Sequence, residues 1–227
     1  MVLLLTGVAC FGYAGYQIWG TNALAQRSYD QERTAIKKSW STASEKDADH
    51  TAGHRSATSR SAADRSRRSA SSDKTAADPQ VPGDAIGLIS IPSIGVDQVP
   101  ILQGVGADVL ARGVGHYPGT AAPGGVGNFA VAGHRITHGQ PFANLLKLNT
   151  GDKIVVETRT EIFTYEIQVA PRNLTVEDTG SWVVDPVPGH PREPATQRLI
   201  TLTTCQDLFH SPDRSVGFGR LISARAK

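Results

Sequence analysis

The sequence is poor in cysteine and in net charge. Its 227 residues include two cysteines, and the first of them, Cys10, lies in an apolar N-terminal segment. Two cysteines so placed exclude an intrachain disulfide framework, and Cys205 is expected to be a free thiol. The formal net charge of +2 gives no electrostatic basis for binding nucleic acid.

The sequence also lacks clustered carboxylates, which are the usual ligands of Ca²⁺. The acidic residues of its C-terminal half are dispersed: Glu157, Glu161, Glu166, Glu177 and Asp178. His134 and His138 are four residues apart, a spacing that would place two metal ligands on one face of a helix. Gly139 and Pro141 follow at once and favour a loop instead. We therefore predict no metal ion and no other cofactor.

Charged side chains are absent from the segment between Met1 and Trp19. Its length approaches the ~20 residues that span a bilayer, and its tyrosines and tryptophan suit the interface. Ala23-Leu24-Ala25 resembles a small-residue cleavage site, so a removable signal peptide is the alternative. The segment is long for a signal peptide and has no basic residues before it. Residues 1–20 are accordingly predicted to be an uncleaved transmembrane anchor.

Large apolar residues are almost absent between about Ser39 and Pro82. Such a stretch cannot bury enough surface to offset the entropy of ordering it, so we expect disorder there. Residues 21–82 are predicted to form a polar linker rich in Ser, Ala and Arg, and a helical extension from Thr21 to about Lys38 is possible. The arginines of this linker suit contact with an anionic wall polymer or lipid, but a solvated tether is the favoured interpretation.

The rest of the chain, from residue 83 to 227, consists of short apolar runs between Gly- and Pro-containing turns. A short helix or turn is predicted over residues 106–112, and a short helix over residues 141–148. Strands are predicted over residues 86–92, 99–102, 128–132, 152–158, 162–169, 198–205 and 215–222. Many short strands with little helix are typical of an all-β barrel or sandwich.

Cys205 ends an apolar run that begins at Leu199. The end of a buried strand gives a nucleophile a rigid mount and access to substrate, although a lone thiol is more often a core residue. Two other residues at the ends of predicted strands favour a catalytic role for Cys205. His134 follows the run that ends in Gly133, and Arg214 precedes the last predicted strand. An imidazole can hold a nearby thiol as thiolate, and a guanidinium can donate to the oxyanion of an acyl intermediate.

Thr201-Leu202-Thr203-Thr204-Cys205 resembles the TLxTC signature of sortases, the cysteine transpeptidases that attach proteins to Gram-positive cell walls. Gly133-His134-Arg135 and Arg214 match the positions of the catalytic His and Arg of that family. Over residues 85–224 the chain is most similar to class E, the actinobacterial housekeeping type. The resemblance implies an all-β fold, a closed eight-stranded barrel with one or two short helices, and His134, Cys205 and Arg214 as catalytic residues.

The resemblance also implies a reaction. Cys205 would attack the threonine carbonyl of an LAxTG or LPxTG sorting motif in a secreted protein, and a peptidoglycan amine would resolve the thioacyl-enzyme. His134 would protonate the departing glycine amine and deprotonate the incoming one. Tyr117 matches a position linked to LAxTG preference in class E, and Thr204 is assigned to substrate binding as well. Their alternatives are a core aromatic residue and a polar strand face.

The same resemblance decides the predicted topology. Basic residues follow the N-terminal apolar segment and none precedes it, which by the positive-inside rule would leave the C-terminal domain in the cytoplasm. Because sortases act outside the cell, we predict a single-pass membrane protein with an extracellular catalytic domain.

Other interpretations stay open on the sequence alone. A pilin-polymerising sortase would use a lysine of a protein partner as its nucleophile. A membrane-tethered binding module or hydrolase on the same fold would leave Cys205 unreactive. His116 and His210 are alternative bases, and Arg214 could instead form a surface ion pair with Asp207 or Asp213.

Overall fold

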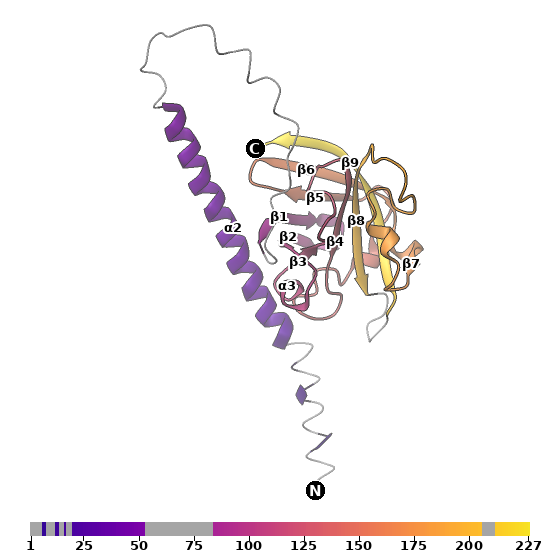
Figure 1. The fold of residues 1–227 in the computed structure, drawn as a ribbon. Helices are drawn as coiled ribbons and strands as arrows, with labels where there is room; N and C mark the ends of the chain where they lie inside the picture. The colour runs from indigo at the N-terminus through magenta and orange to yellow at the C-terminus, as the bar shows by residue number, and fades with distance from the viewer. Residues whose placement is uncertain (1–5, 8–11, 14–15, 17–19, 53–83, 206–211) are drawn as a thin grey trace.

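The computed structural model describes residues 6–7, 12–13, 16, 20–52, 84–205 and 212–227. Most of the predicted anchor over residues 1–20, and the part of the predicted linker over residues 53–83, lie outside these ranges. A long helix, α2 (Thr21–Ala52), runs beside a β-barrel (Figure 1). Within the described ranges, no helix has both the length and the apolar character needed to cross a membrane.

The described residues form one nine-stranded sheet in the order β6-β5-β1-β2-β3-β4-β8-β9-β7, and β6 also pairs with β9. That pairing closes a ring of eight strands, with the two-residue β7 (Thr175–Val176) outside it. The predicted closed eight-stranded all-β barrel is therefore confirmed. Its strands are β1 (Ala85–Ile91), β2 (Val96–Gln103), β3 (Val114–His116), β4 (Gly127–Ala132), β5 (Lys153–Glu157), β6 (Glu161–Val169), β8 (Arg198–Cys205) and β9 (Arg214–Ala226).

Short helical turns connect the strands. They are η2 (Pro92–Ile94), α3 (Ala107–Leu110), η3 (Leu145–Lys147), η4 (Pro171–Asn173) and η5 (Ser181–Val184). The predicted helix at residues 106–112 corresponds to α3. Of the short helix predicted over 141–148, only the 3₁₀-helix η3 is present, and residues 141–144 form turns. Phe142, Leu145 and Leu148 are all fully buried, and their spacing of three suits the three-residue turn of a 3₁₀-helix.

The strands β4 and β8 are adjacent and parallel in the barrel wall. Phe129 and Ile200 are register partners, and neither side chain is exposed. The buried polar residues of these strands also bond to each other, since the Thr201 hydroxyl donates to Asn128 Oδ1 at 2.8 Å. The Asn128 amide in turn donates to the carbonyls of Val183 and Asp185. A buried network with its partners in place stiffens the wall from which the last residues of both strands project.

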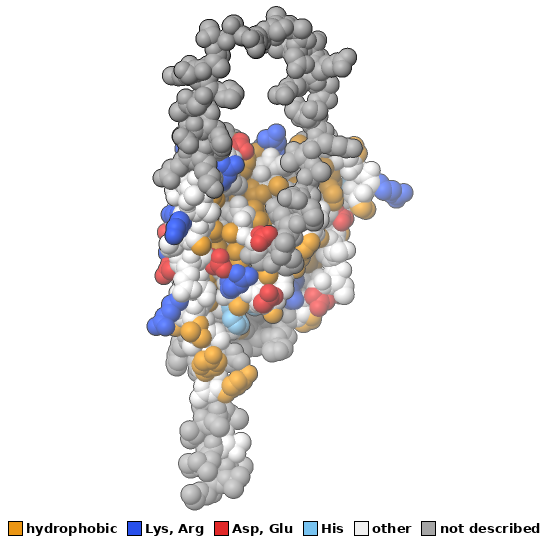
Figure 2. Space-filling view, turned by 60° about the vertical axis from the view of Figure 1, so that its left-hand side comes forward, with side chains coloured by type: hydrophobic (Ala, Val, Ile, Leu, Met, Phe, Trp, Pro, Cys, Tyr) orange, Lys and Arg blue, Asp and Glu red, His pale blue; other side chains and the backbone are white. Residues whose placement is uncertain are grey.

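The helix α2 extends beyond the Lys38 limit expected for a helical extension, and it is packed against the barrel. Ala25, Tyr29 and Ile36 are 3%, 5% and 3% exposed, and their spacing of four and seven forms an apolar stripe on one face. Polar contacts flank this stripe: Lys37 Nζ donates to Gln98 Oε1 at 2.6 Å, and Glu32 pairs with Arg112. Charged side chains of both signs lie along the helix and the neighbouring barrel face (Figure 2). Side chains of α2 between Asn22 and Lys37 therefore contact the barrel.

Candidate active site

Cys205 and Arg214 face each other across the two strands β8 and β9. Cys205 is the last residue of β8, Arg214 is the first of β9, and the antiparallel register makes them direct partners. Directly opposed residues on antiparallel strands have their Cα atoms about 4.5–5.5 Å apart and their side chains on the same face. Cys205 is a free, half-buried cysteine. The register thus places a thiol and a guanidinium on one face at one end of the barrel.

His134 reaches the same end of the barrel from β4. The parallel pairing of β4 with β8 runs as far as Ala132 and Thr203. Beyond it, the Gly133 N–H donates to the Thr203 carbonyl at 3.1 Å, and the Thr204 hydroxyl donates to the Gly133 carbonyl at 2.8 Å. These two bonds continue the alignment past the end of β4. His134 is thereby held beside the end of β8, where Cys205 lies.

A further residue of this edge was not predicted as a site residue. Arg135 Nη1 donates to the carbonyl of Cys205 at 3.4 Å, so the guanidinium links the His134 segment to the backbone of Cys205. The only available signal was the place of Arg135 directly after His134, and that position alone does not specify a partner 70 residues away.

Thr204 and Tyr117 occupy supporting positions. Thr204 is 3% exposed and its hydroxyl proton is already donated to Gly133, so direct donation to a substrate would require breaking that bond. The half-buried Tyr117 has its hydroxyl 3.1 Å from Thr203 Oγ1. Because the Thr203 hydroxyl donates to the Val131 carbonyl, Tyr117 is the donor in this pair. Tyr117 therefore contacts β8 two residues before Cys205.

The alternative base His116 is occupied elsewhere. It is 5% exposed, and its ring nitrogens contact Gln103 Oε1 at 2.9 Å and the Ala121 carbonyl at 3.0 Å. Burial lowers its pKa, and the hydrogen bond to Ala121 opposes this only in part. His116 is thus a satisfied core histidine. The other alternative, His210, lies outside the described residues, as does Asp207.

Burial controls the protonation of His134. It is the main cause that lowers the pKa of His134 from 6.5 to about 4, and the positive charge that His138 can carry lowers it further. The two imidazole rings are stacked with their centroids 4.9 Å apart. Near neutral pH, His134 is therefore an uncharged imidazole that can accept a proton. Across the described ranges, no group of three or more His, Cys, Asp or Glu residues is arranged to hold a metal ion.

Replacing His138 with asparagine is expected to raise the pKa of His134, because the substitution removes the neighbouring positive charge and part of the covering ring. Asparagine also tolerates the positive φ of 52° at this position. The rise will be incomplete, since burial is the larger cause. The active form of a general base is the unprotonated one, so activity will be lost at a higher pH than in the wild type as the solution is acidified. NMR titration of the His134 ring protons, alongside a pH–rate profile, measures this; an acid limb that stays in place would contradict it.

Comparison with known proteins identifies the family of the chain. The sortase domain family matches residues 89–222. Sortase SrtE1 of Streptomyces coelicolor is 32% identical over 238 residues, covering 100% of this chain and 57% of that protein. Sortase E of Streptomyces avermitilis is 38% identical, with a TM-score of 0.57 over 64% of this chain and 93% of that one. Sortase E1 of Streptomyces coelicolor, solved with a tripeptide in its active site, is 37% identical. Its TM-score is 0.57, and the match covers 65% of this chain and 93% of that one.

The chain belongs to the sortase family, whose members are transpeptidases. It spans 57% of the length of the full-length SrtE1 relative.

Proposed function

We propose that this chain is a cysteine transpeptidase that joins secreted proteins to the cell wall. The observation that carries the proposal is the convergence at one barrel edge of a free thiol, an uncharged imidazole and a guanidinium. Cys205 and Arg214 are register partners, and the bond from Thr204 to Gly133 brings His134 beside them. A nucleophile, a base and an oxyanion donor are the groups that acyl transfer requires.

The first half of the reaction is acylation. Uncharged His134 accepts the proton of the Cys205 thiol as the sulfur attacks the carbonyl carbon of the scissile peptide bond. The carbonyl π electrons move to oxygen, and the Arg214 guanidinium donates to the resulting oxyanion. When the intermediate collapses, the C–N bond breaks and the His134 imidazolium gives its proton to the departing amine. The products are a thioacyl-enzyme and a free amino terminus.

The second half transfers the acyl group. An incoming amine attacks the thioester carbon, and His134 accepts a proton from the attacking nitrogen. The C–S bond then breaks, the new amide forms, and the proton returns to Cys205. A low pKa of His134 suits this half, because an uncharged imidazole is the form that can accept a proton from the amine.

We assign the chain to class E, with Thr–Gly cleavage in an LAxTG or LPxTG motif and a peptidoglycan amine as acceptor. The support is the TLTTC and AGHR sequences together with the similarity to sortase E proteins. A relative of this type holds a tripeptide in its active site. Tyr117 is the proposed contact for the second residue of the motif, since its ring lies next to the strand that carries Cys205.

Residues 1–20 are proposed to anchor the protein in the membrane with the barrel outside the cell. The support is the uncharged apolar sequence of residues 1–19 and the membrane association common among sortases. Protease digestion of intact protoplasts tests this: degradation of the barrel supports an outside location, and a protected barrel opposes it.

The proposed reaction is tested with the full chain in mild detergent. It is incubated separately with an LAxTG and an LPxTG peptide, each with a short amine acceptor, and the products are identified by mass spectrometry. Transfer with preference for LAxTG is expected, and Tyr117→Phe is expected to reduce that preference up to about tenfold. Cleavage without transfer would identify a different acceptor, such as the lysine side chain used in pilin polymerisation. Absence of a thioacyl adduct with both peptides would refute the proposal in favour of a binding module.

A further inference from the structure

The loop after His134 has an unusual backbone. His138, Gly139 and Gln140 all have positive φ values, of 52°, 78° and 41°. Non-glycine residues rarely adopt this left-handed conformation, and it persists only where surrounding contacts hold it. Within the loop, the Gln140 N–H donates to the Thr137 carbonyl and the Phe142 N–H donates to the His134 carbonyl. The His138 ring also contacts Thr137 Oγ1 and stacks on His134, and further contacts reach the loop from outside the barrel.

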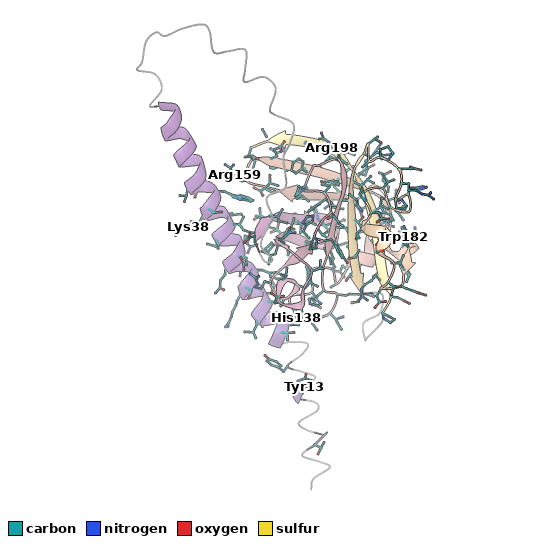
Figure 3. All side chains as sticks on the ribbon, in the orientation of Figure 1. Tyr13, Lys38, His138, Arg159, Trp182 and Arg198 are labelled. Carbon is teal, nitrogen blue, oxygen red and sulfur yellow. The ribbon has the colours of Figure 1, made fainter. Side chains whose placement is uncertain are left out.

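Those contacts come from α2. The Tyr29 hydroxyl donates to the His138 carbonyl at 2.7 Å, and the Gly139 N–H donates to Asn22 Oδ1 at 2.8 Å. Gln26 Nε2 adds a longer bond to the Gly139 carbonyl at 3.4 Å. The helix thus bonds to consecutive peptide groups of the left-handed run. Figure 3 shows His138 beside the N-terminal end of α2.

Tyr29 also covers the loop by packing. Its side chain is buried at 5% exposure, and a Cβ atom at Gly139 would lie 2.7 Å from the ring carbon Cζ. Burial raises the pKa of Tyr29, so its hydroxyl keeps the proton that it donates to the loop. Ring and hydroxyl act on the same two residues, His138 and Gly139, which lie four and five positions after His134.

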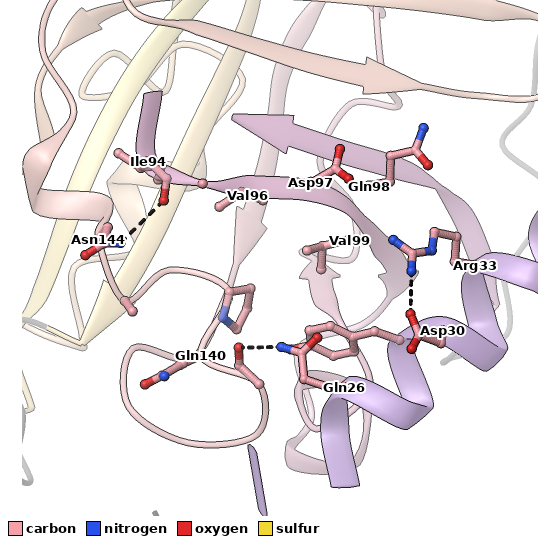
Figure 4. Close-up of a pocket in the computed structure, with 15 residues that line it drawn as sticks. Gln26, Asp30, Arg33, Ile94, Val96, Asp97, Gln98, Val99, Gln140 and Asn144 are labelled. Carbon is pink, nitrogen blue, oxygen red and sulfur yellow. Dashed lines mark hydrogen bonds and ion pairs between the residues drawn. The ribbon is translucent and has the colours of Figure 1, made fainter. Parts of the chain in front are cut away.

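The seam between helix and barrel is not filled by continuous apolar packing. Beside the Tyr29 contact, it contains a cavity of about 420 Å³ whose lining includes Gln26, Arg33, Val96, Gly139 and Asn144 (Figure 4). Two further bonds, both of 3.5 Å, join the helix to the loop: Asn22 Nδ2 donates to the Ile136 carbonyl, and the His138 N–H donates to Thr21 Oγ1. The bonds of 2.7 and 2.8 Å made by Tyr29 and Asn22 are the shortest of the five.

We propose that α2 is a positioning element of the active site, in which Tyr29 and Asn22 hold the loop that orients His134. The proposal rests on the proposed function in assigning the proton transfers to His134. If α2 positions this loop, activity depends on the docking of α2 against the barrel. This helix begins immediately after the predicted anchor. Neither residue touches the reacting atoms, and both act through His138 and Gly139.

The test compares three variants of the full chain in detergent. Tyr29→Phe removes the hydroxyl and keeps the ring, and Asn22→Ala removes the acceptor for Gly139. Glu32→Gln is the matched control. Glu32 lies on α2 like Tyr29 and Asn22, and the substitution breaks its ion pair with Arg112 of the barrel domain without changing a contact to the loop. Misplacing a catalytic group by about 1 Å can cost ~10²-fold, so we expect kcat to fall about ten- to a hundredfold in the double variant Tyr29→Phe/Asn22→Ala. KM for the sorting peptide should change less than about twofold, and Glu32→Gln should retain wild-type kinetics.

A second measurement follows the loop independently of activity. Hydrogen exchange at the Gly139 amide should accelerate in Asn22→Ala and in the double variant, and not in Glu32→Gln. The NMR titration midpoint of His134 should also rise toward 6.5 as water reaches the ring. His138 stacks on His134 and is the charged group that lowers its pKa. The other titratable or charged residues of this edge are Arg135 beside it, Cys205 on β8 and Arg214 on β9, and Tyr29 on α2 bonds to the backbone of His138.

The outcomes separate the two proposals. If the wild type forms no thioacyl adduct, the proposed function fails, while exchange at Gly139 and the His134 titration still report on positioning. If exchange, titration and kcat are unchanged in the double variant, the positioning proposal is overturned. Equal losses in Glu32→Gln and the double variant would also overturn it, because they would indicate general loosening of the helix. Thermal unfolding identifies a variant that fails to fold. If the double variant fails to fold, kcat, exchange and titration of the single variants Tyr29→Phe and Asn22→Ala test the positioning proposal.

Discussion

Cys205→Ala is expected to abolish the thioacyl adduct and to lower transpeptidation by at least ~10³-fold. Within the described residues, Cys205 supplies the only thiol at the edge where His134 and Arg214 converge, so the variant lacks the sulfur that would carry the acyl group. Water could still cleave the peptide slowly in the remaining site, but without a covalent intermediate there is no acyl group to hand to an amine. The loss should therefore fall on transfer even if traces of hydrolysis persist.

The matched control is Cys10→Ala, which replaces the other cysteine of the chain. It should leave adduct formation and transfer unchanged. Cys205 is half-buried at a strand end, so the unfolding temperature of Cys205→Ala should stay within a few degrees of the wild type. Intact-protein mass spectrometry after mixing with peptide measures the adduct directly. An adduct on Cys205→Ala would place the nucleophile elsewhere and remove the basis of the mechanism.

The strands that frame this site were predictable because they combine length with a continuous apolar run. Residues 198–205 were predicted as a strand and form β8 with the same bounds. The three-residue β3 and the two-residue β7 were not predicted, because so few residues show no periodicity. Thr204 was predicted to bind substrate. Its bond to Gly133 could not be inferred, because it depends on the parallel register of β4 and β8.

The candidate site residues were predicted from their order along the chain and from the family resemblance. Their relative positions and their protonation could not be predicted from that order. Cys205 and Arg214 are nine residues apart in the sequence, yet they are opposite one another in the sheet. The pKa of His134 depends on burial and on His138, and neither quantity is visible in a residue pattern. A sequence can thus propose a thiol, a base and a guanidinium, whereas their protonation is a property of the folded site.

The contribution of α2 was the largest difference between prediction and structure. A helical extension over residues 21–38 was considered, but the stripe formed by Ala25, Tyr29 and Ile36 was not identified as a docking face. It consists of only three residues with polar neighbours, and the surface it covers includes a loop more than 100 residues later. Long-range contacts of this kind leave little trace in local hydrophobic periodicity.

Arg214→Ala is expected to lower kcat/KM about 10²–10³-fold, because a positioned donor to a developing oxyanion is worth ~2.7–4 kcal/mol of transition-state stabilisation. The backbone already orients this side chain. Arg214 Nη1 donates to the carbonyls of Pro212 and Asp213, at 2.8 and 3.2 Å, and the residue starts β9 directly opposite Cys205. Arg214→Lys should restore less than a tenth of the lost activity, since an ammonium cannot hold these carbonyls and also present a planar fork to an oxyanion.

Arg220→Ala is the matched control, because Arg220 is an exposed arginine on the same strand and its register partner on β8 is Leu199. It should retain activity within about twofold. Measuring kcat and KM separately distinguishes two roles for Arg214: a drop mainly in kcat indicates transition-state stabilisation, and a rise mainly in KM indicates peptide binding. Full activity in Arg214→Lys would show that any positive charge suffices there, and would assign the oxyanion to another donor. Such a result would leave Cys205 and His134 in place and would limit the role of Arg214 to local electrostatics.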